Sequence, residues 1–232
     1  MELLGVKIDN FSLIEVLQKI QGFLVDGGQH QIATVNPEFI VLAQKDREFR
    51  EILNRADLNV ADGFGIVLAA RLTGKKIMRV AGVDLIENLR LRLGNNKIFL
   101  FGGENGAAEK AARDWPVVIG FSENPENAVE LINGCQPDIL LVALGAPKQE
   151  KWITQNLAKI PSVKVAIGVG GAFKFLSGQV RRAPRWLRRI GLEWAWRTIM
   201  EPSRIMKVWR SVIVFGWLVL KARAIAAKDA VG

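Results

Sequence analysis

The strongest constraint on this chain is the regular alternation of short apolar runs with amphipathic stretches in its second half. Residues 97–101 (KIFLF), 138–144 (DILLVAL) and 163–169 (VKVAIGV) are apolar along nearly their whole length. A strand without a polar face must be covered on both sides, and helices between such strands provide that cover. The chain is therefore predicted to be an α/β protein with a Rossmann-like, doubly wound, mostly parallel sheet.

The first half of the chain shows the same pattern with shorter strands. Its clearest helix signals are Ser12, a good N-cap, and Asn36-Pro37, with Asn at the cap and Pro at the first helical position. Further strands are predicted at 30–34, 56–60 and 117–121. Helices are predicted at 12–26, from 36 onward, 62–72, 82–93, 105–114, 125–133, 147–158, 184–200 and 202–227. In such sheets ligands bind beyond the carboxyl ends of the strands, so residues that follow a strand are site candidates.

The formal charge of +9 is distributed very unevenly. Residues 1–180 carry 20 basic and 20 acidic side chains, whereas residues 181–232 carry 12 basic and three acidic ones. Five of the seven Trp residues also lie in this tail. We therefore predict an α/β catalytic domain at 1–180 and a basic, Trp-rich helical appendage at 181–232. Such asymmetry suggests an anionic partner, membrane or nucleic acid, although a charged helical face in water is the simpler alternative.

No segment of the tail is long enough to span a bilayer. The longest apolar run, 211–220, has ten residues and suits a buried or interfacial helix. No secretory signal is apparent at the N-terminus. We expect the tail to lie on an anionic membrane surface, with aromatic rings at headgroup level and basic side chains beside them. The predicted membrane-facing residues are Arg204, Lys207, Trp209, Arg210, Trp217 and Lys221.

The scarcity of Cys, His and Tyr limits the chemistry that the chain could perform. Cys135 and His30 are the only residues of their kinds, and there is no Tyr. A single Cys rules out an intrachain disulfide framework and points to a reducing compartment. Zinc clusters built from His and Cys are excluded as well. Proton transfer in an enzyme of this composition is expected to use a carboxylate, Lys or a hydroxyl.

Asp62 follows a predicted strand and opens a predicted helix. Its spacing alone favours a helix N-cap, and the functional alternative is a general base that removes a proton from a hydroxyl. Thr34 and Asn36 end a neighbouring strand in the same way, and capping would also explain Asn36. Two strand ends that present Thr, Asn and Asp nevertheless favour a polar pocket that includes Gly63.

Glycine-rich turns follow three other strands. Gly102-Gly103 opens a helix whose N-terminus could meet a phosphate, with Glu123 about 20 residues on as a ribose ligand. A tight turn explains this loop equally well. Gly145 precedes Lys148 and Gln149, and Lys148 at a helix N-terminus suggests a compensating anion. Gly170-Gly171 ends the last strand and could admit a phosphate or ribose.

The chain contains no Asp-x-Asp pair. Many nucleotide-sugar enzymes hold a divalent metal on the diphosphate with such a pair. We therefore predict no metal and no cofactor. A diphosphate leaving group would instead need Arg, Lys and backbone amides, with Arg79, Arg181 and Arg182 as candidates.

Taken together, several motifs resemble the TagA/WecG/CpsF glycosyltransferase family (glycosyltransferase family 26), and they occur in order over nearly the whole chain. The motifs of the body are Thr34-Val35-Asn36-Pro37-Glu38, Asn59-Val60-Ala61-Asp62-Gly63, Arg79-Val80-Ala81-Gly82-Val83-Asp84-Leu85, Leu144-Gly145-Ala146-Pro147-Lys148-Gln149-Glu150 and Gly168-Val169-Gly170-Gly171-Ala172-Phe173. Those of the tail are Arg182-Ala183-Pro184, Gly191-Leu192-Glu193-Trp194 and Glu201-Pro202-Ser203-Arg204.

The resemblance implies a cytoplasmic enzyme that is peripheral on the inner face of the cell membrane. It would transfer N-acetylmannosamine, or its uronic acid, from a UDP-sugar to N-acetylglucosamine on a polyprenyl diphosphate, for teichoic acid or related surface polysaccharides. The family works with inversion and without an essential metal. Its base maps onto Asp62, its pocket residues onto Thr34, Asn36 and Gln149, and its motif arginine onto Arg79. Arginines of the family's appendage help to complete the site.

Lys174 departs from this pattern, because the family commonly has Asp after Gly-Gly-x-Phe. The change from a negative to a positive charge at this position affects either the choice of donor sugar or the local salt bridges.

The main alternative function is a non-catalytic nucleotide-binding module whose tail binds nucleic acid or protein. The apolar run 212–220 argues against nucleic acid, which needs no such run, and suggests lipid or a second copy of the chain. A Rossmann dehydrogenase lacks a credible fingerprint and His or Tyr chemistry.

Overall fold

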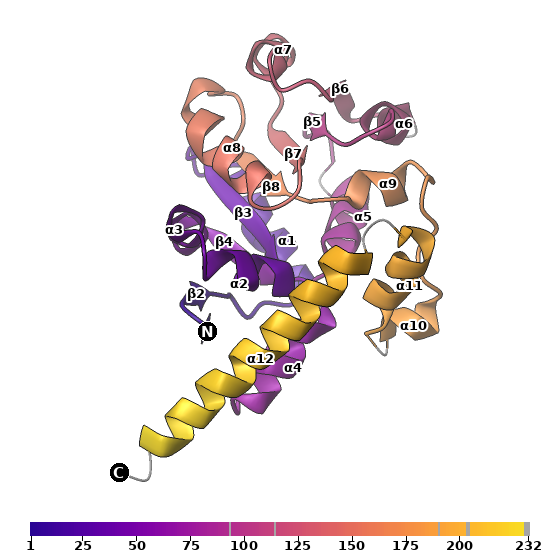
Figure 1. Cartoon of the computed structure of the whole chain (residues 1–232). Helices are drawn as coiled ribbons and strands as arrows, with labels where there is room; N and C mark the ends of the chain where they lie inside the picture. Colours follow the sequence, from indigo (N-terminus) through magenta and orange to yellow (C-terminus); the bar gives the residue numbers. More distant parts are fainter. Residues whose placement is uncertain (93, 114, 190, 203–204, 230–232) are drawn as a thin grey trace.

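The computed structural model of the chain describes residues 1–232 apart from 93, 114, 190, 203–204 and 230–232 (Figure 1). The side chains of residues 189, 207, 210 and 226–229 also lie outside the description. Within the described part, a central sheet is flanked by helices on both faces, and a long C-terminal helix crosses one side of the molecule (Figure 1). The predicted α/β class is confirmed.

All six strands of the central sheet are parallel, in the order β4-β3-β8-β7-β5-β6. Their bounds are β3 His30–Val35, β4 Leu58–Ala61, β5 Ile98–Gly102, β6 Val118–Ser122, β7 Ile139–Ala143 and β8 Val165–Gly168. The middle strands β7 and β8 are fully buried apart from one position, as their continuous apolar runs predict. A small antiparallel ribbon at the N-terminus, formed by β1 Glu2–Leu3 and β2 Val6–Lys7, was not predicted from the sequence.

Helices cover the two faces of the sheet in separate apolar clusters. One face is packed by α1 Leu13–Phe23, α5 Gly82–Arg92, α6 Ala107–Arg113 and α9 Ala172–Leu176. The other face is packed by α2 Pro37–Ala43, α3 Arg47–Arg55, α4 Phe64–Leu72, α7 Ala128–Cys135, α8 Lys148–Asn156 and the short 3₁₀ turn η1 Leu157–Lys159. Because the six strands are parallel, their carboxyl ends lie at the same edge of the sheet. The tail, residues 181–232, lies at this edge too.

Two predicted helices differ from the structure. The helix after Asn36 ends at Ala43, and Asp46 caps the separate helix α3 by accepting a bond from the Phe49 amide at 3.0 Å. The predicted helix 184–200 is two helices, α10 Arg185–Arg189 and α11 Glu193–Met200. Gly191 lies between them with φ +81, which residues other than Gly rarely adopt.

Gly191 also fixes the tail to the body. A Cβ atom at this position would lie 2.3 Å from Cγ of Phe64, well inside any real contact. The turn between α10 and α11 therefore rests directly on the first residue of α4. This close approach positions α11 over the carboxyl end of β4.

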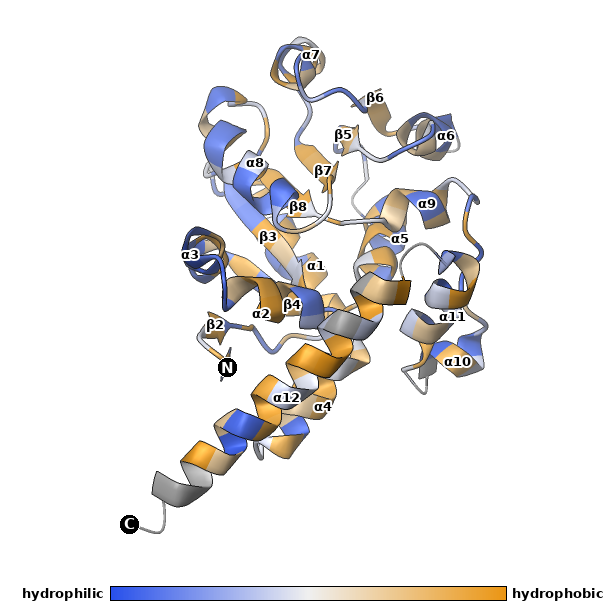
Figure 2. Ribbon diagram, in the orientation of Figure 1, coloured by the Kyte–Doolittle hydropathy of each residue, from blue (hydrophilic) through white to orange (hydrophobic). Residues whose placement is uncertain are grey.

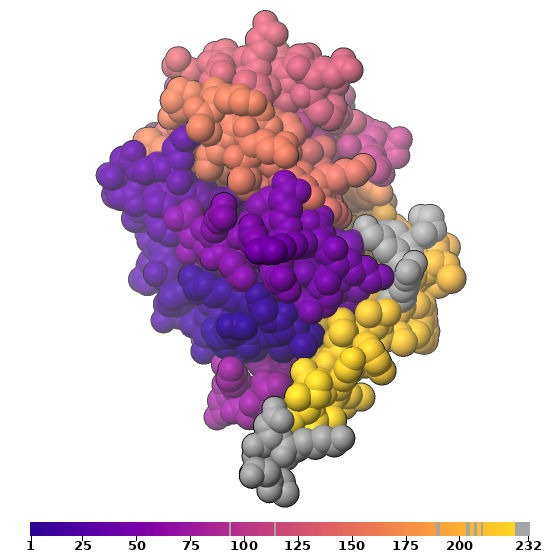
Figure 3. All heavy atoms as spheres, turned by 60° about the vertical axis from the view of Figure 1, so that its left-hand side comes forward, coloured from indigo at the N-terminus to yellow at the C-terminus, as the bar shows by residue number. Residues whose placement is uncertain are grey.

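The last helix, α12 Ile205–Asp229, lies across α2 and beside α4, and its C-terminal end projects past the sheet (Figures 1 and 3). Phe215 and Val219 on its inner side belong to the same apolar cluster as α2 and α4. Its outer side carries exposed apolar residues, and Figure 2 shows how apolar the helix is along its middle. These outer residues form one stripe of the helix: Met206, Trp209, Ile213, Trp217 and Leu220. No described helix is both long and apolar enough to cross a membrane.

Replacing Phe215 with Ala should destabilise the fold by about 3 kcal/mol, because a buried aromatic side chain is lost from the contact of α12 with the body. Ile213→Ala on the outer side of the same helix is the matched control, with a loss below about 0.5 kcal/mol. Urea unfolding followed by far-UV circular dichroism measures both. Equal destabilisation by the two variants would contradict the packing of α12 described above.

Candidate functional site

A cavity of about 470 Å³ lies between the carboxyl ends of β3 and β4 and the tail. The body contributes the residues after these two strands and the start of α5, and the tail contributes α11, the turn before it and the inner side of α12. Its charged and amide side chains are Asn36, Glu38, Asp62, Arg79, Glu193 and Arg197. Its larger apolar side chains are Phe64, Leu68, Val83, Phe175, Leu192, Trp194, Val208, Val212 and Phe215.

Asp62 lies in this cavity and does not cap α4, the helix that follows it, so the predicted capping of that helix is wrong. The N-cap of α4 is Gly63, with φ +98 and no side-chain cap bond. The Asp62 carboxyl instead accepts a bond from the backbone N–H of Gly82, at the start of α5. Burial raises the pKa of Asp62 from 3.8 to about 6; the Gly82 bond and the charges of Arg79 and Arg197 only partly offset this. A carboxylate with a pKa near 6 is a good proton acceptor at neutral pH.

Arg79 and Arg197 reach the cavity from opposite sides. Arg79 donates to the Arg188 carbonyl at 3.4 Å and lies 3.8 Å from Glu193. Arg197 pairs with Glu201 at 2.9 Å and donates to the Gly171 carbonyl at 3.4 Å. Sequence reasoning did not single out Arg197. Its only signal was spacing, because Glu193, Arg197 and Glu201 recur every four residues and so share one face of the tail.

Thr34 and Asn36 have defined structural roles. The Thr34 hydroxyl donates to the Gly168 carbonyl at 2.9 Å and is buried beneath the cavity, where it joins β3 to the end of β8. Asn36 accepts bonds from the Glu38 and Phe39 amides, so its predicted capping of α2 is confirmed. Asn36 also lines the cavity, whereas Thr34 does not.

Gln149 joins the loops after β7 and β8. Its Oε1 accepts the amides of Gly145 at 3.1 Å and Gly170 at 3.0 Å, and its Nε2 donates to Glu150 at 2.6 Å. Gly168 makes this possible, because a Cβ there would lie 2.5 Å from the Glu150 carboxylate. Most of the polar capacity of Gln149 is thus used within the protein. A direct contact between Gln149 and a ligand stays a prediction.

The helix after β7 begins one residue later than predicted and contains a buried acidic side chain. Pro147 is the N-cap of α8 and not its first helical residue. Glu150 is completely buried, and burial raises its pKa to about 7 despite the bond from Gln149. Lys148 is exposed, and no ion pair joins it to another described residue.

The turn after β5 does not offer the helix terminus that its sequence suggested. Glu123 accepts the amides of Gly106 and Ala108, both at 3.2 Å, and so caps α6 itself. The amide of Gly103 is bonded to the Ala143 carbonyl at 3.0 Å. These amides and the Glu123 carboxylate therefore form hydrogen bonds within the protein. Ligand contacts at Gly102 and Gly103, and a role for Glu123 as a ribose ligand, stay predictions.

Of the other basic residues discussed from the sequence, two form ion pairs and one is exposed. Arg182 is held by Asp84 at 2.7 Å and Glu87 at 2.8 Å, so its guanidinium is already neutralised. Arg181 is exposed and lines neither of the two main cavities. Lys174 pairs with Glu201 at 3.1 Å and Glu104 at 3.2 Å. The charge reversal at Lys174 is thus matched by local salt bridges.

The predicted membrane-facing residues are partly described. Trp209 and Trp217 are more than half exposed, and the Lys221 ammonium lies 5.0 Å from the centre of the Trp217 ring. Arg204 lies outside the described residues, as do the side chains of Lys207 and Arg210. In the part of the chain that the structure describes, no three His, Cys, Asp or Glu side chains are grouped to hold a metal.

Known proteins are similar to this chain over both its body and its tail. The family described as "Glycosyl transferase WecG/TagA/CpsF family" matches residues 1–229. The chain is similar to a Bacillus subtilis (strain 168) protein, with 36% identity over 187 residues, which cover 75% of this chain and 72% of that protein. It is 31% identical over 237 residues to a Staphylococcus aureus (strain MRSA252) protein, across 96% and 92% of the two chains. Both relatives are named N-acetylglucosaminyldiphosphoundecaprenol N-acetyl-beta-D-mannosaminyltransferase.

Glu150 should make the stability of the protein depend on pH. Its pKa of about 7 exceeds the ordinary 4.5, so the folded state holds a proton that the unfolded state has lost between these values. The stability that this bound proton adds to the folded state is fully present below pH 4.5. It is lost as the pH rises through 7. Glu150→Gln stays neutral, so at pH 8.5 it should be more stable than the wild type, by up to about 3 kcal/mol.

Denaturant unfolding at pH 8.5 and pH 5 tests this expectation. The difference between variant and wild type should shrink toward pH 5. Glu130→Gln is the control, because Glu130 is exposed, and its difference from the wild type should not change with pH. A pH-independent difference for Glu150→Gln would contradict the protonated state of the buried carboxyl.

Proposed function

This chain belongs to the WecG/TagA/CpsF family of glycosyltransferases, and we propose that it transfers N-acetylmannosamine from a UDP-sugar to N-acetylglucosamine on a polyprenyl diphosphate. The acceptor and the transferred sugar follow from the names of its relatives. The reaction inverts the anomeric centre and needs no metal. It takes place at the inner face of the cell membrane and supplies teichoic acid or a related surface polysaccharide.

The observation that carries this proposal is the cavity around Asp62. Its carboxyl has a pKa of about 6, lies at a strand end and is flanked by the guanidinium groups of Arg79 and Arg197. In a single displacement, the acceptor hydroxyl attacks the anomeric carbon, and Asp62 takes the hydroxyl proton. The bond from that carbon to UDP breaks, and its electron pair leaves with the β-phosphate. The transition state has oxocarbenium character, as in other glycosyl reactions.

Cationic side chains stabilise the departing UDP. Arg79 and Arg197 enter the same cavity and face the position where charge develops. The loops after β7 and β8, held together by Gln149, provide a rigid edge for the nucleotide next to this cavity. Gly145, Gly170 and Gly171 are the backbone positions there that can approach a ribose or phosphate closely.

The tail, residues 181–232, completes the site and attaches the enzyme to the membrane. Its residues Leu192–Thr198 and Val208–Phe215 close one side of the cavity. The outer side of α12 presents Trp209 and Trp217 with Lys221 beside them, a combination that suits the interface of an anionic bilayer. Nucleic acid is not required by any of these contacts.

Asp62→Asn should lower kcat by about 10²–10⁴-fold, because an amide cannot accept the proton of the acceptor hydroxyl. UDP release from UDP-N-acetylmannosamine, with a short-chain prenyl-diphosphate N-acetylglucosamine as acceptor, measures this change. The affinity for the donor should change much less. Asp57→Asn, at the amino end of the same strand, is the control and should retain activity.

The pH profile provides a second measure of the same group. Wild-type kcat/KM should fall about tenfold per pH unit below pH 6, since only the ionised carboxylate accepts a proton and its pKa is raised to about 6. Activity of Asp62→Asn within tenfold of the wild type would exclude Asp62 as the base.

Donor screening with UDP-N-acetylglucosamine and the uronic acids tests the identity of the sugar.

Trp209→Ser/Trp217→Ser should weaken binding to phosphatidylglycerol vesicles by at least about tenfold, because two aromatic side chains leave the exposed stripe of α12. Vesicle co-sedimentation of the full chain measures the effect. Ile14→Ser/Val25→Ser removes two exposed apolar side chains from another face and should bind like the wild type. If the two double variants bind equally well, α12 is not the membrane-contacting surface.

A further inference from the structure

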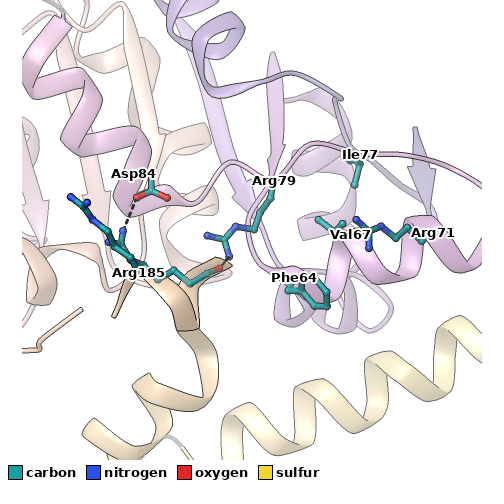
Figure 4. Close-up of a pocket in the computed structure, with 8 residues that line it drawn as sticks. Phe64, Val67, Arg71, Ile77, Arg79, Asp84 and Arg185 are labelled. Carbon is teal, nitrogen blue, oxygen red and sulfur yellow. Dashed lines mark hydrogen bonds and ion pairs between the residues drawn. The ribbon is translucent and has the colours of Figure 1, made fainter. Parts of the chain in front are cut away.

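A second cavity, of about 570 Å³, is lined in part by Arg79 but not by Asp62 (Figure 4). Four arginines line it: Arg71 from α4, Arg79 from the segment before α5, and Arg185 and Arg188 from α10. Among the residues that the structure describes, Asp84 of α5 is the only acidic one in the lining. We propose that this cavity binds a phosphate group carried by a lipid.

The charges around the cavity are not balanced by the protein. Asp84 already accepts Arg182 at 2.7 Å, and it lies 3.6 Å from Arg188. Arg71 and Arg185 are exposed, and neither forms an ion pair with a described residue. An arginine stays charged under all ordinary conditions. Arg79 lies 3.8 Å from Glu193, and Arg188 shares Asp84 with Arg182. The positive charges around the cavity therefore exceed the negative ones, which favours an anion between the arginines.

The shape and chemistry of the cavity indicate which anion it takes. Guanidinium groups bind phosphate oxygens in pairs, and several of them around one space suit a phosphate or diphosphate. The remaining lining is apolar, made by Phe64, Val67 and Ile77. A compact inorganic anion would leave this side unused, whereas a phosphate attached to a hydrocarbon chain fills both parts.

The segments that line the cavity also carry exposed apolar side chains. Leu72 follows Arg71 in the sequence, Met78 lies between Ile77 and Arg79, and Trp186 follows Arg185, and all three side chains are exposed. Exposed apolar side chains on segments that line a basic cavity suit contact with lipid.

The two cavities share Arg79 and Phe64, so a ligand in one is adjacent to a ligand in the other. If the proposed function holds, the sugar of the acceptor lies beside Asp62 and its diphosphate reaches the four arginines. A phospholipid headgroup offers the same phosphate chemistry from the membrane itself. Both sources place a lipid-linked phosphate in the second cavity.

Direct binding of geranyl diphosphate to the full chain tests the site without any enzymatic assay. Calorimetry should show binding to the wild type and at least tenfold weaker binding to Arg71→Gln/Arg185→Gln. The control, Lys45→Gln/Arg92→Gln, removes two exposed positive charges elsewhere and should bind within twofold of the wild type. The proposal is overturned if the Arg71/Arg185 variant binds both geranyl diphosphate and phosphatidylglycerol vesicles as tightly as the wild type, or if the wild type binds neither.

Two further measurements identify the source of the phosphate. If it belongs to the acceptor, the variant raises the KM for a prenyl-diphosphate acceptor at least tenfold and leaves kcat and the donor KM unchanged. If it belongs to a headgroup, vesicle affinity falls and the acceptor KM without vesicles is unchanged. A rise in donor KM alone overturns the site. Absence of transfer by the wild type would overturn the proposed function and leave the calorimetric result intact.

Discussion

The chemistry available at the cavity depends on the desolvation of one carboxyl group. Asp62 owes its pKa of about 6 chiefly to burial, and that burial is produced jointly by the body and the tail. Burial opposes the bond from Gly82 and the charges of Arg79 and Arg197, which lower the pKa of the same carboxyl. The close approach of Gly191 to Phe64 holds the tail against the body beside this group.

The charges of the tail serve more than one purpose within the described structure. Arg182 of the tail pairs with Asp84 and Glu87 of the body, and Lys174 of the body pairs with Glu201 of the tail, so these ion pairs hold the tail in place. Arg197 pairs with Glu201 and also lines the cavity around Asp62, and Arg185 lies at the second cavity. The basic side chains of the tail thus include both structural ion pairs and cations that line cavities.

The sheet could be predicted from the sequence because its apolar strands carry a strong local signal. The place of Asp62 in a cavity could not be predicted from spacing, since a residue that caps the next helix occupies the same position after a strand. In the structure Gly63, with φ +98, is the N-cap of α4, and this excludes that cap for Asp62. Glu123 shows the opposite case, because its distance in sequence suggested a ribose ligand whereas the fold places it at the end of α6. Arg197 and the second cavity depend on tertiary contacts of the tail, for which the sequence has no local signal.

Two sides of the helix α12 have different surroundings. Val208, Ser211 and Phe215 form part of the cavity around Asp62, while Trp209, Ile213 and Trp217 face outward from the same few turns. Both sets of side chains belong to one continuous helix, so a shift of its outer surface would also shift the side chains that line the cavity.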